Sequence, residues 1–145
     1  SRFLSLCGND LNRLRLAEVF LFTMPGTPCV FYGDELGVAG ATEPDYRSAM
    51  PWNAPPEDLR PLLRDLAALR REDSVLVLGT FRSLWMEGSL YLYRRELGDT
   101  AVIVALNAGP SPAQLPPSIA PSPSPVLCCA YEDGTMGPFG YAVWK

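Results

Sequence analysis

Residues 22–37 of this 145-residue chain are FTMPGTPCVFYGDELG. Pro25 and Gly26 stop any helix that reaches them, because proline removes a backbone donor and glycine favours non-helical backbone. The run from Pro28 to Tyr32 is apolar without alternation, which is typical of a strand buried on both faces of a parallel sheet. Gly33 ends that run. The stretch therefore predicts a helix end, a buried strand and a loop in succession.

Helices are predicted on both sides of this strand. Upstream, Asn9 or Asp10 can cap a helix whose apolar residues recur at near-helical spacing. Those apolar residues are Leu11, Leu14, Ala17, Leu21 and Met24. Downstream, an amphipathic helix is predicted from about residue 58 to residue 71. Residues 1–74 thus predict a helix–strand–helix unit of α/β type.

After residue 75 the pattern changes to short β runs separated by turn signals. The predicted strands are Thr80–Met86, Leu90–Glu96, Ala101–Asn107, Val126–Tyr131 and Tyr141–Trp144, with a further short strand around Gln114–Ile119. The Pro/Ser-rich stretch 109–125 is interpreted as an extended surface connection. Residues 75–145 therefore predict an all-β domain, a small antiparallel β-sandwich.

Composition excludes several classes of function. Hydrophobic residues make up 48% and charged residues 19%, as in ordinary globular domains. The net charge is −4 and no block of Lys and Arg occurs, so nucleic acid is not an expected partner. The chain has no histidine, so these residues cannot build a His-based catalytic site or a His-ligated metal site. We expect neither a metal nor a cofactor.

No membrane segment is expected. Prolines at 25 and 28 interrupt the most apolar uncharged run, residues 19–33, whereas a spanning helix needs about 20 predominantly apolar residues. No signal peptide is visible at the N-terminal residues. The cysteines are predicted to be free thiols, with Cys29 a small buried residue of the strand; they are Cys7, Cys29, Cys128 and Cys129. The compartment stays undecided, with the cytoplasm favoured.

A single parallel-type strand requires neighbours. Each buried backbone N–H or C=O group that lacks a partner costs about 1 to 3 kcal/mol. Residues 1–72 are therefore interpreted as the end of a larger α/β domain. Pairing with the β segment, or with another copy of the chain, is the alternative.

The stretch at 22–37 closely resembles the segment through the seventh helix and eighth strand of the α-amylase family, glycoside hydrolase family 13. Further matching pieces follow in the family's order: Glu43–Arg47, Met50–Trp52, Leu66–Arg71, Gly79–Phe81, Val104–Asn107 and Gly140–Val143. The oligosaccharide-acting members are the most similar, namely cyclomaltodextrinases, neopullulanases and α-glucosidases. The resemblance implies the last helix–strand–helix part of a (β/α)8 barrel over 1–74, followed by a C-terminal β domain over 75–145.

The resemblance also implies where the catalytic acids lie. In the family a nucleophilic Asp, a general-acid Glu and a stabilising Asp follow the fourth, fifth and seventh strands, all upstream of Ser1. Retaining hydrolysis needs two carboxyl groups about 5 to 5.5 Å apart. No catalytic residue is assigned here, so the chain alone is expected to be inactive. Its expected partners are an α-glucan or maltooligosaccharide and the missing N-terminal part of the barrel.

Substrate contact is expected from the loop after the strand. In the family the Asp and Arg of an Asp-Pro-x-x-Arg pattern reach the sugar, and the matching residues here are Glu43 and Arg47. Glu43 is one methylene longer than the family's Asp, so Asp45 is the alternative carboxylate. A guanidinium beside carboxylates can orient a pyranose ring. A solvated acidic turn with a local ion pair is the other interpretation.

Two residues after the strand and two aromatic residues of the loop are further candidates for chemistry or stacking. Asp34 and Glu35 follow the predicted strand at the catalytic rim of a barrel. Adjacent side chains usually point in different directions, so we interpret both as loop-orienting rather than as an acid–nucleophile pair. Tyr46 and Trp52 could stack on a sugar, but packing within the loop's own small core is favoured.

The sequence therefore predicts the C-terminal part of a retaining α-glucan hydrolase or transglycosylase. This part would contribute a substrate-contacting loop but not the catalytic acids. Two alternatives stay open: a non-catalytic amylase-like interaction protein, and a carbohydrate-binding module without a catalytic partner.

Overall fold

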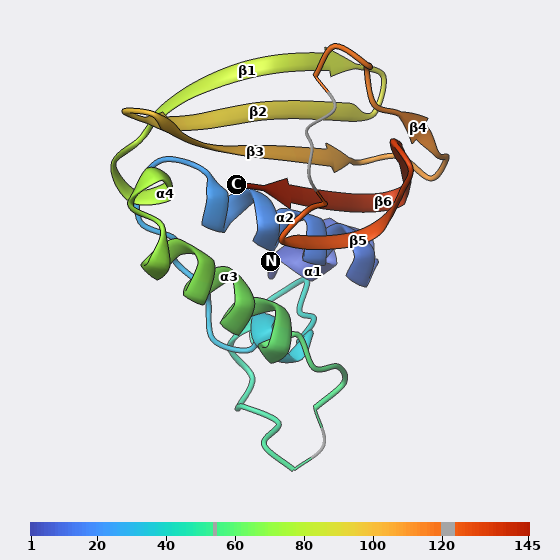
Figure 1. Ribbon diagram of the computed structural model, residues 1–145. Helices are drawn as coiled ribbons and strands as arrows, with labels where there is room; N and C mark the ends of the chain where they lie inside the picture. The colour runs from blue at the N-terminus through green and yellow to red at the C-terminus, as the bar shows by residue number, and fades with distance from the viewer. Residues whose placement is uncertain (54, 120–123) are drawn as a thin grey trace.

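The computed structural model describes residues 1–53, 55–119 and 124–145. A helical layer packs on one antiparallel sheet, and a long loop extends away from the sheet (Figure 1). The helices are α1 (Phe3–Leu6), α2 (Leu11–Thr23), α3 (Arg60–Glu72) and α4 (Ser74–Leu78), with 3-10 turns η1 (Asp34–Leu36) and η2 (Asp45–Arg47). The strands are β1 (Thr80–Glu87), β2 (Leu90–Leu97), β3 (Thr100–Asn107), β4 (Ala113–Gln114), β5 (Leu127–Glu132) and β6 (Thr135–Trp144). No helix among these residues is long and apolar enough to cross a membrane.

All six strands belong to one sheet of order β1-β2-β3-β6-β4, with β5 paired to β6. Strand β6 pairs with β3 through residues 141–144 and with β4 through residues 135–136, and β5 pairs with both of these parts of β6. The predicted sandwich of two sheets is therefore wrong for the described residues. Strand β6 takes part in both sets of pairings, and Phe139 between them has a positive φ of 50°.

Successive side chains of the strands point to opposite faces of the sheet, and both faces are apolar. One face packs against α2, α3 and α4, and its buried residues are Tyr93, Val102, Val104, Leu106, Tyr141 and Val143. The other face carries Leu90, Leu92, Ala105, Met136, Ala142 and Trp144, and Leu115 packs on it. Leu115 belongs to the Pro/Ser-rich stretch, so part of that stretch covers the second face rather than running over the surface; its residues 120–123 lie outside the described residues.

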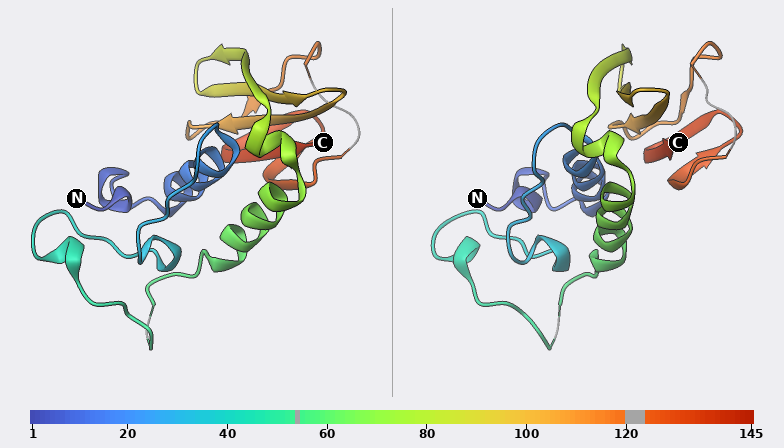
Figure 2. Two further views of the ribbon diagram at one scale, coloured as in Figure 1. Left: turned by 90° about the vertical axis from the view of Figure 1, so that its left-hand side faces the viewer. Right: turned by 60° about the vertical axis from the view of Figure 1, so that its left-hand side comes forward.

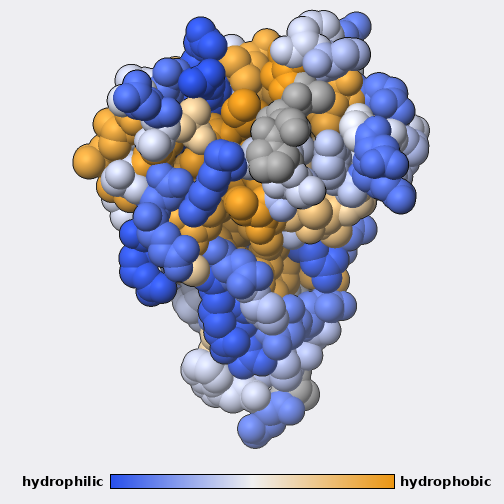
Figure 3. Space-filling view, viewed as in Figure 1, coloured by the Kyte–Doolittle hydropathy of each residue, from blue (hydrophilic) through white to orange (hydrophobic). Residues whose placement is uncertain are grey.

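The hydrophobic face of the helical layer and that of the sheet form a single core. Leu16, Val19 and Phe22 of α2 and Leu66 and Leu69 of α3 belong to the same buried cluster as the sheet residues. Figure 2 shows α2 and α3 side by side beneath the sheet. In Figure 3 hydrophobic colour gathers in the upper part of the molecule around the sheet, and the lower part around the long loop is hydrophilic. The division of the chain at residue 74 stays a prediction.

Helix α2 begins and ends as the sequence predicts. The Asp10 side chain accepts a hydrogen bond from the amide of Asn12 at 2.9 Å, which satisfies one free donor of the first turn. At the other end, Arg70 of α3 donates to the carbonyl of Phe22 at 2.8 Å and to that of Met24 at 3.2 Å. The helix C-terminus is thus held by a cation, which suits its partial negative charge.

Arg95 of β2 joins the helical layer to the sheet. Its guanidinium is fully buried and donates to the carbonyls of Thr23 at 2.8 Å, Gly79 at 2.8 Å and Thr80 at 3.2 Å. The hydroxyl groups of Thr23 and Tyr93 share a further buried hydrogen bond. Burial lowers the pKa of Arg95 from its ordinary value. One side chain therefore fixes the end of α2 against the start of β1.

The predicted strand at 28–32 is wrong. Residues 28–31 form neither helix nor strand, Tyr32 lies in a turn, and no strand of the described residues pairs with them. Phe31 and Tyr32 are 46% and 42% exposed, and Cys29 is exposed rather than buried as predicted. The local pattern is that of a buried strand, but a strand also requires a neighbour to accept its backbone hydrogen bonds.

Replacing Arg95 by Met tests its role in joining the helical layer to the sheet. The variant keeps most of the side-chain volume but leaves three carbonyl groups without their donor, and unsatisfied buried groups cost about 1 to 3 kcal/mol each. We expect a loss of about 3 kcal/mol in the free energy of unfolding, measured by urea denaturation. Arg82→Ala, at an exposed position of β1, should change it by less than about 0.5 kcal/mol. Equal losses for both variants would contradict the assigned role of Arg95.

Candidate functional site

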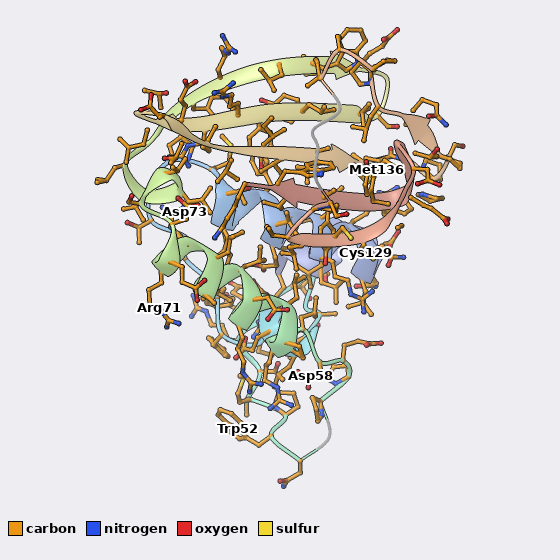
Figure 4. The ribbon with its side chains drawn as sticks, viewed as in Figure 1. Trp52, Asp58, Arg71, Asp73, Cys129 and Met136 are labelled. Atoms are coloured by element: carbon orange, nitrogen blue, oxygen red, sulfur yellow. The ribbon has the colours of Figure 1, made fainter. Side chains whose placement is uncertain are left out.

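The loop between η1 and α3 leaves the helical layer and returns to it. Its two ends meet where the amide of Leu59 donates to the carbonyl of Glu35 at 2.9 Å. Gly37 allows this close approach, because a Cβ atom there would lie 2.9 Å from the Cβ atom of Glu57. Trp52 lies near the far tip of the loop (Figure 4). The closed base fixes where the loop starts and ends, and its tip faces solvent.

The first half of the loop is anchored to the N-terminal residues. The amide of Arg2 donates to the carbonyl of Gly40 at 2.7 Å, and the amide of Gly40 donates to the Ser5 hydroxyl at 2.9 Å. A side chain at position 40 would not fit, because its Cβ atom would lie 2.6 Å from the Cα atom of Tyr46. This contact holds η2 against the rest of the chain.

The three predicted substrate-binding residues come together on η2 and the residues before it. Arg47 Nη1 lies 3.0 Å from Glu43 Oε1, and the two side chains are 68% and 57% exposed. Asp45 Oδ2 accepts a hydrogen bond from the Thr42 hydroxyl at 3.4 Å. An exposed ion pair of this kind contributes little to stability, so its donors and acceptors are free to exchange water for a ligand.

The two aromatic residues of the loop differ in their surroundings. The Arg47 guanidinium lies 5.5 Å from the centre of the half-buried Tyr46 ring. Trp52 is 76% exposed, so the predicted core packing of this residue is wrong. Trp52 lies on the part of the loop that projects away from the helical layer (Figure 4).

Asp34 and Glu35, the predicted loop-orienting pair, point to different partners. Glu35 Oε2 accepts a hydrogen bond from the amide of Gly33 at 2.7 Å. Asp34 is 8% exposed, and its Oδ1 atom lies 3.8 Å from Arg2 Nη1. Both carboxylates therefore contact groups next to residues 28–32, which suits a positioning role.

The sequence analysis missed Arg2. Its side chain is buried, donates to the Tyr32 carbonyl at 2.6 Å, and lies 4.9 Å from the ring centre of Phe31 and 4.8 Å from that of Tyr32. Nothing in the local pattern around residue 2 indicates burial. Arg2 and Tyr32 are thirty residues apart in the sequence.

The sequence analysis also missed Glu18, which is 5% exposed on α2. A signal for its burial was present, because Glu18 follows Leu14 by four residues and precedes Phe22 by four. Residues at that spacing share one face of a helix. Glu18 thus lies on the apolar face that α2 buries.

Glu18 and Asp34 line one pocket of about 410 Å³. Burial, together with the smaller effect of the charges of Asp34 and Glu35, raises the pKa of Glu18 to about 7. Burial also raises the pKa of Asp34, although Arg2 acts in the opposite direction. A retaining glycosidase needs one carboxyl group that stays ionised beside one that is protonated. Burial shifts both pKa values in the same direction, so the shifts do not distinguish one group as the acid and the other as the nucleophile.

Comparison with known protein families shows which family the chain belongs to. Residues 1–75 match the family described as α-amylase, catalytic domain. The chain belongs to the α-amylase family. The match includes α1, α2, residues 28–32 and the whole loop that carries Glu43, Asp45 and Arg47.

Curated relatives agree with this membership. Neopullulanase 2 of Thermoactinomyces vulgaris is 40% identical over 111 residues, which cover 73% of this chain and 19% of that protein. A cyclomaltodextrinase of Thermoanaerobacter pseudethanolicus is 36% identical over 108 residues, with the same coverage of 73% and 19%. The chain thus spans about a fifth of the length of these relatives.

Solved structures share the fold over nearly the whole chain. The debranching enzyme of Nostoc punctiforme superposes with a TM-score of 0.81 at 27% identity, covering 98% of this chain and 32% of that one. An α-amylase from H. orenii superposes with a TM-score of 0.72 at 20% identity, which concerns the fold alone, and covers 98% of this chain and 37% of that one. The arrangement of helices, loop and sheet is therefore the one found in this family's structures.

Glu18→Gln should make stability depend less on pH. In the fold the Glu18 pKa is about 7, against an ordinary value of 4.5, so the folded chain holds a proton that the unfolded chain releases between these values. Stability is therefore lost as pH rises from about 4.5 to about 7 and stays lower above that. At pH 8 we expect the variant to melt about 3 to 6 °C above the parent chain, and at pH 4 to melt with it.

Differential scanning calorimetry at both pH values measures these melting temperatures. The matched control is Glu87→Gln, at an exposed end of β1, which should leave the melting temperature unchanged at both. If Glu18→Gln raised the melting temperature equally at pH 4 and pH 8, or did not raise it at pH 8, the ionisation of the buried Glu18 carboxyl would not be the cause of the pH dependence.

Proposed function

We propose that this chain is the C-terminal part of a retaining glycoside hydrolase or transglycosylase that acts on α-glucans or maltooligosaccharides. Residues 1–74 would complete its (β/α)8 barrel, and residues 75–145 would form its C-terminal β domain. The catalytic carboxylates would lie on polypeptide outside these 145 residues. This substrate class is supported by the relatives described above, which are named cyclomaltodextrinase and neopullulanase.

The observation that carries the proposal is the exposed ion pair of Glu43 and Arg47 on an anchored loop. The pair is 3.0 Å long and open to solvent, whereas the backbone beneath it is fixed by the contact of Gly40 with Tyr46. A fixed backbone with exposed polar groups can bind a ligand without a large ordering cost. The loop also falls within the part that matches the catalytic domain of the family.

The chemistry of these groups suits a sugar. The Arg47 guanidinium presents several donors in one plane, which fits two neighbouring hydroxyl oxygens of a pyranose ring. Glu43 and Asp45 accept hydrogen bonds from hydroxyl groups, so either can supply the matching acceptor. In this role the loop orients the substrate, while the bond cleavage is done by acids elsewhere.

The first test is an assay of the purified chain alone. We expect no release of p-nitrophenol from p-nitrophenyl α-maltoside above the rate of the buffer blank, because no pair of carboxyl groups is assigned as acid and nucleophile. Turnover that persists through purification to a single species, and is abolished by Glu18→Gln or Asp34→Asn, would contradict the proposal. A rate that these variants leave unchanged would indicate a contaminating enzyme.

The second test joins the chain to the rest of a barrel. The chain is inserted in place of the segment of neopullulanase 2 of Thermoactinomyces vulgaris that 73% of it matches, and hydrolysis of maltoheptaose is measured. Arg47→Ala should lower kcat/KM at least about tenfold, because hydrogen bonds to charged groups contribute about 1.5 to 3 kcal/mol. Arg82→Ala, at an exposed position of the sheet, is the control and should leave kcat/KM unchanged.

Two outcomes of that experiment would contradict the proposal. If Arg47→Ala and Glu43→Gln both leave kcat/KM unchanged, the loop does not contact the sugar. If the joined protein is folded and inactive but binds maltoheptaose in a calorimetric titration, the chain belongs to a carbohydrate-binding protein without catalysis.

A further inference from the structure

A small hollow lies on the face of the sheet that does not pack on the helices, at the turn between β1 and β2. Its volume is about 170 Å³. The chain after β4 passes this turn, at the opposite end of the molecule from the long loop (Figure 1). The hollow is lined by Trp85, Glu87, Leu90, Ala113, Gln114 and Pro116, so it shares no residue with the predicted sugar-contacting loop.

The strand register places Trp85 and Glu87 on one face of the sheet. Trp85 pairs with Leu92 and Glu87 with Leu90, and both leucines are buried on that face. Residues directly opposite each other on paired strands share a face. Trp85 is 37% exposed, and its indole packs on no other aromatic ring of the described residues. The sheet therefore holds an indole that stays partly open to solvent beside a carboxylate.

Two polar side chains face the same hollow as the indole. Gln114 Nε2 donates to the Thr135 hydroxyl on the neighbouring strand at 2.7 Å, which orients the amide and leaves its Oε1 atom as an acceptor. Glu87 is exposed and forms no ion pair with a described residue. Carboxylate and amide oxygens accept hydrogen bonds from hydroxyl groups. The hollow thus combines one apolar ring with two acceptors for hydroxyl donors.

We propose that this hollow binds one glucose ring of an α-glucan. The C–H face of the pyranose packs on the Trp85 indole, and its hydroxyl groups donate to Glu87 and Gln114. The inference rests on the proposed function for the identity of the glucan and adds a second contact to it. A glucan long enough to reach both this hollow and the loop binds more tightly than a short one, because the second contact forms at a high effective concentration.

Other ligands fit the hollow less well. Sites for drug-sized apolar molecules have volumes of about 300 to 1,000 Å³, well above that of this hollow. A β-linked glucan is flat and extended, so it suits a row of aromatic rings, whereas Trp85 is the one aromatic ring in the lining formed by the described residues. An α-linked glucan curves, so one ring can enter while its neighbours turn into solvent.

The experiment follows the tryptophan indole signals of the nitrogen-15-labelled chain by NMR during titration with maltoheptaose. The chain has three tryptophans, and each signal is assigned from its Trp→Phe variant. Trp85 reports on the hollow, and Trp144, which is 2% exposed, is the buried reference. Cellopentaose, a β-linked glucan, is titrated in parallel.

We expect maltoheptaose to shift the Trp85 signal to saturation and to leave the Trp144 signal in place. Cellopentaose should bind at least about tenfold more weakly, because the single ring of Trp85 stacks only one sugar. Glu87→Ala and Gln114→Ala should each weaken the binding of maltoheptaose about threefold or more, because each removes a hydrogen-bond acceptor. Met86→Ala is the matched control: Met86 is 78% exposed and pairs with Tyr91, whose side chain lies on the helical face.

Three results would overturn the proposal. One is an unchanged Trp85 signal at about 10 mM maltoheptaose, and another is equal binding of cellopentaose. The third is unchanged binding in both Glu87→Ala and Gln114→Ala.

A last variant separates this inference from the sugar-contact role of the loop. In the Arg47→Ala chain the Trp85 shift should persist with the same dissociation constant, because Arg47 does not line the hollow. Loss of the shift in that chain would contradict a separate site. The kcat/KM of Arg47→Ala in the joined protein tests the loop alone, so the two failures are distinguishable.

Discussion

The structure depends on the buried guanidinium of Arg95. It donates to the last carbonyl of α2, at Thr23, and to the carbonyls of Gly79 and Thr80 at the start of β1. These groups belong to the helical layer and to the sheet, so one side chain fixes the distance and direction between the two layers. Arg70 holds the same helix end from α3. A buried cation is costly unless its donors are satisfied, and carbonyl groups at a helix C-terminus satisfy them without a second buried charge.

This fixed helix end determines where the pocket beside α2 lies. The chain leaves α2 at Thr23, bends at residues 24–26 and reaches η1 through a turn at residues 32–33, and Glu18 and Asp34 line one pocket together with Thr27 and Cys29. In the sheet, the side-chain amide of Asn107 donates to the carbonyls of Ser111 and Gly137. Among the described residues, Arg2, Glu18 and Asp34 have buried side-chain atoms without a hydrogen-bond partner within residues 1–75, the part that matches the family, and Arg94 and Trp144 have such atoms in the sheet.

Much of the fold could be predicted from the sequence, because local signals determine it. Asp10 and the proline after Met24 mark both ends of α2, and the alternation of the residues around Val104 matches β3. The local pattern at 28–32 predicts a strand, but strand pairing depends on neighbours, and no strand of the described residues pairs with this segment. Strand β6 was predicted too short, because Gly137 and Gly140 within it resemble a turn. In the site, the exposed loop residues follow from the family pattern, whereas the burial of Arg2 depends on contacts thirty residues away.

The central claim is that these residues work as one part of a larger α-glucan-acting polypeptide. The most direct test is the mass of the polypeptide that carries them in its native source, measured by immunoprecipitation with an antibody against residues 75–145 followed by intact mass spectrometry. The account predicts a mass well above the 15.9 kDa of this chain, with room for a barrel of about 250 residues. A single native species of 15.9 kDa would contradict it.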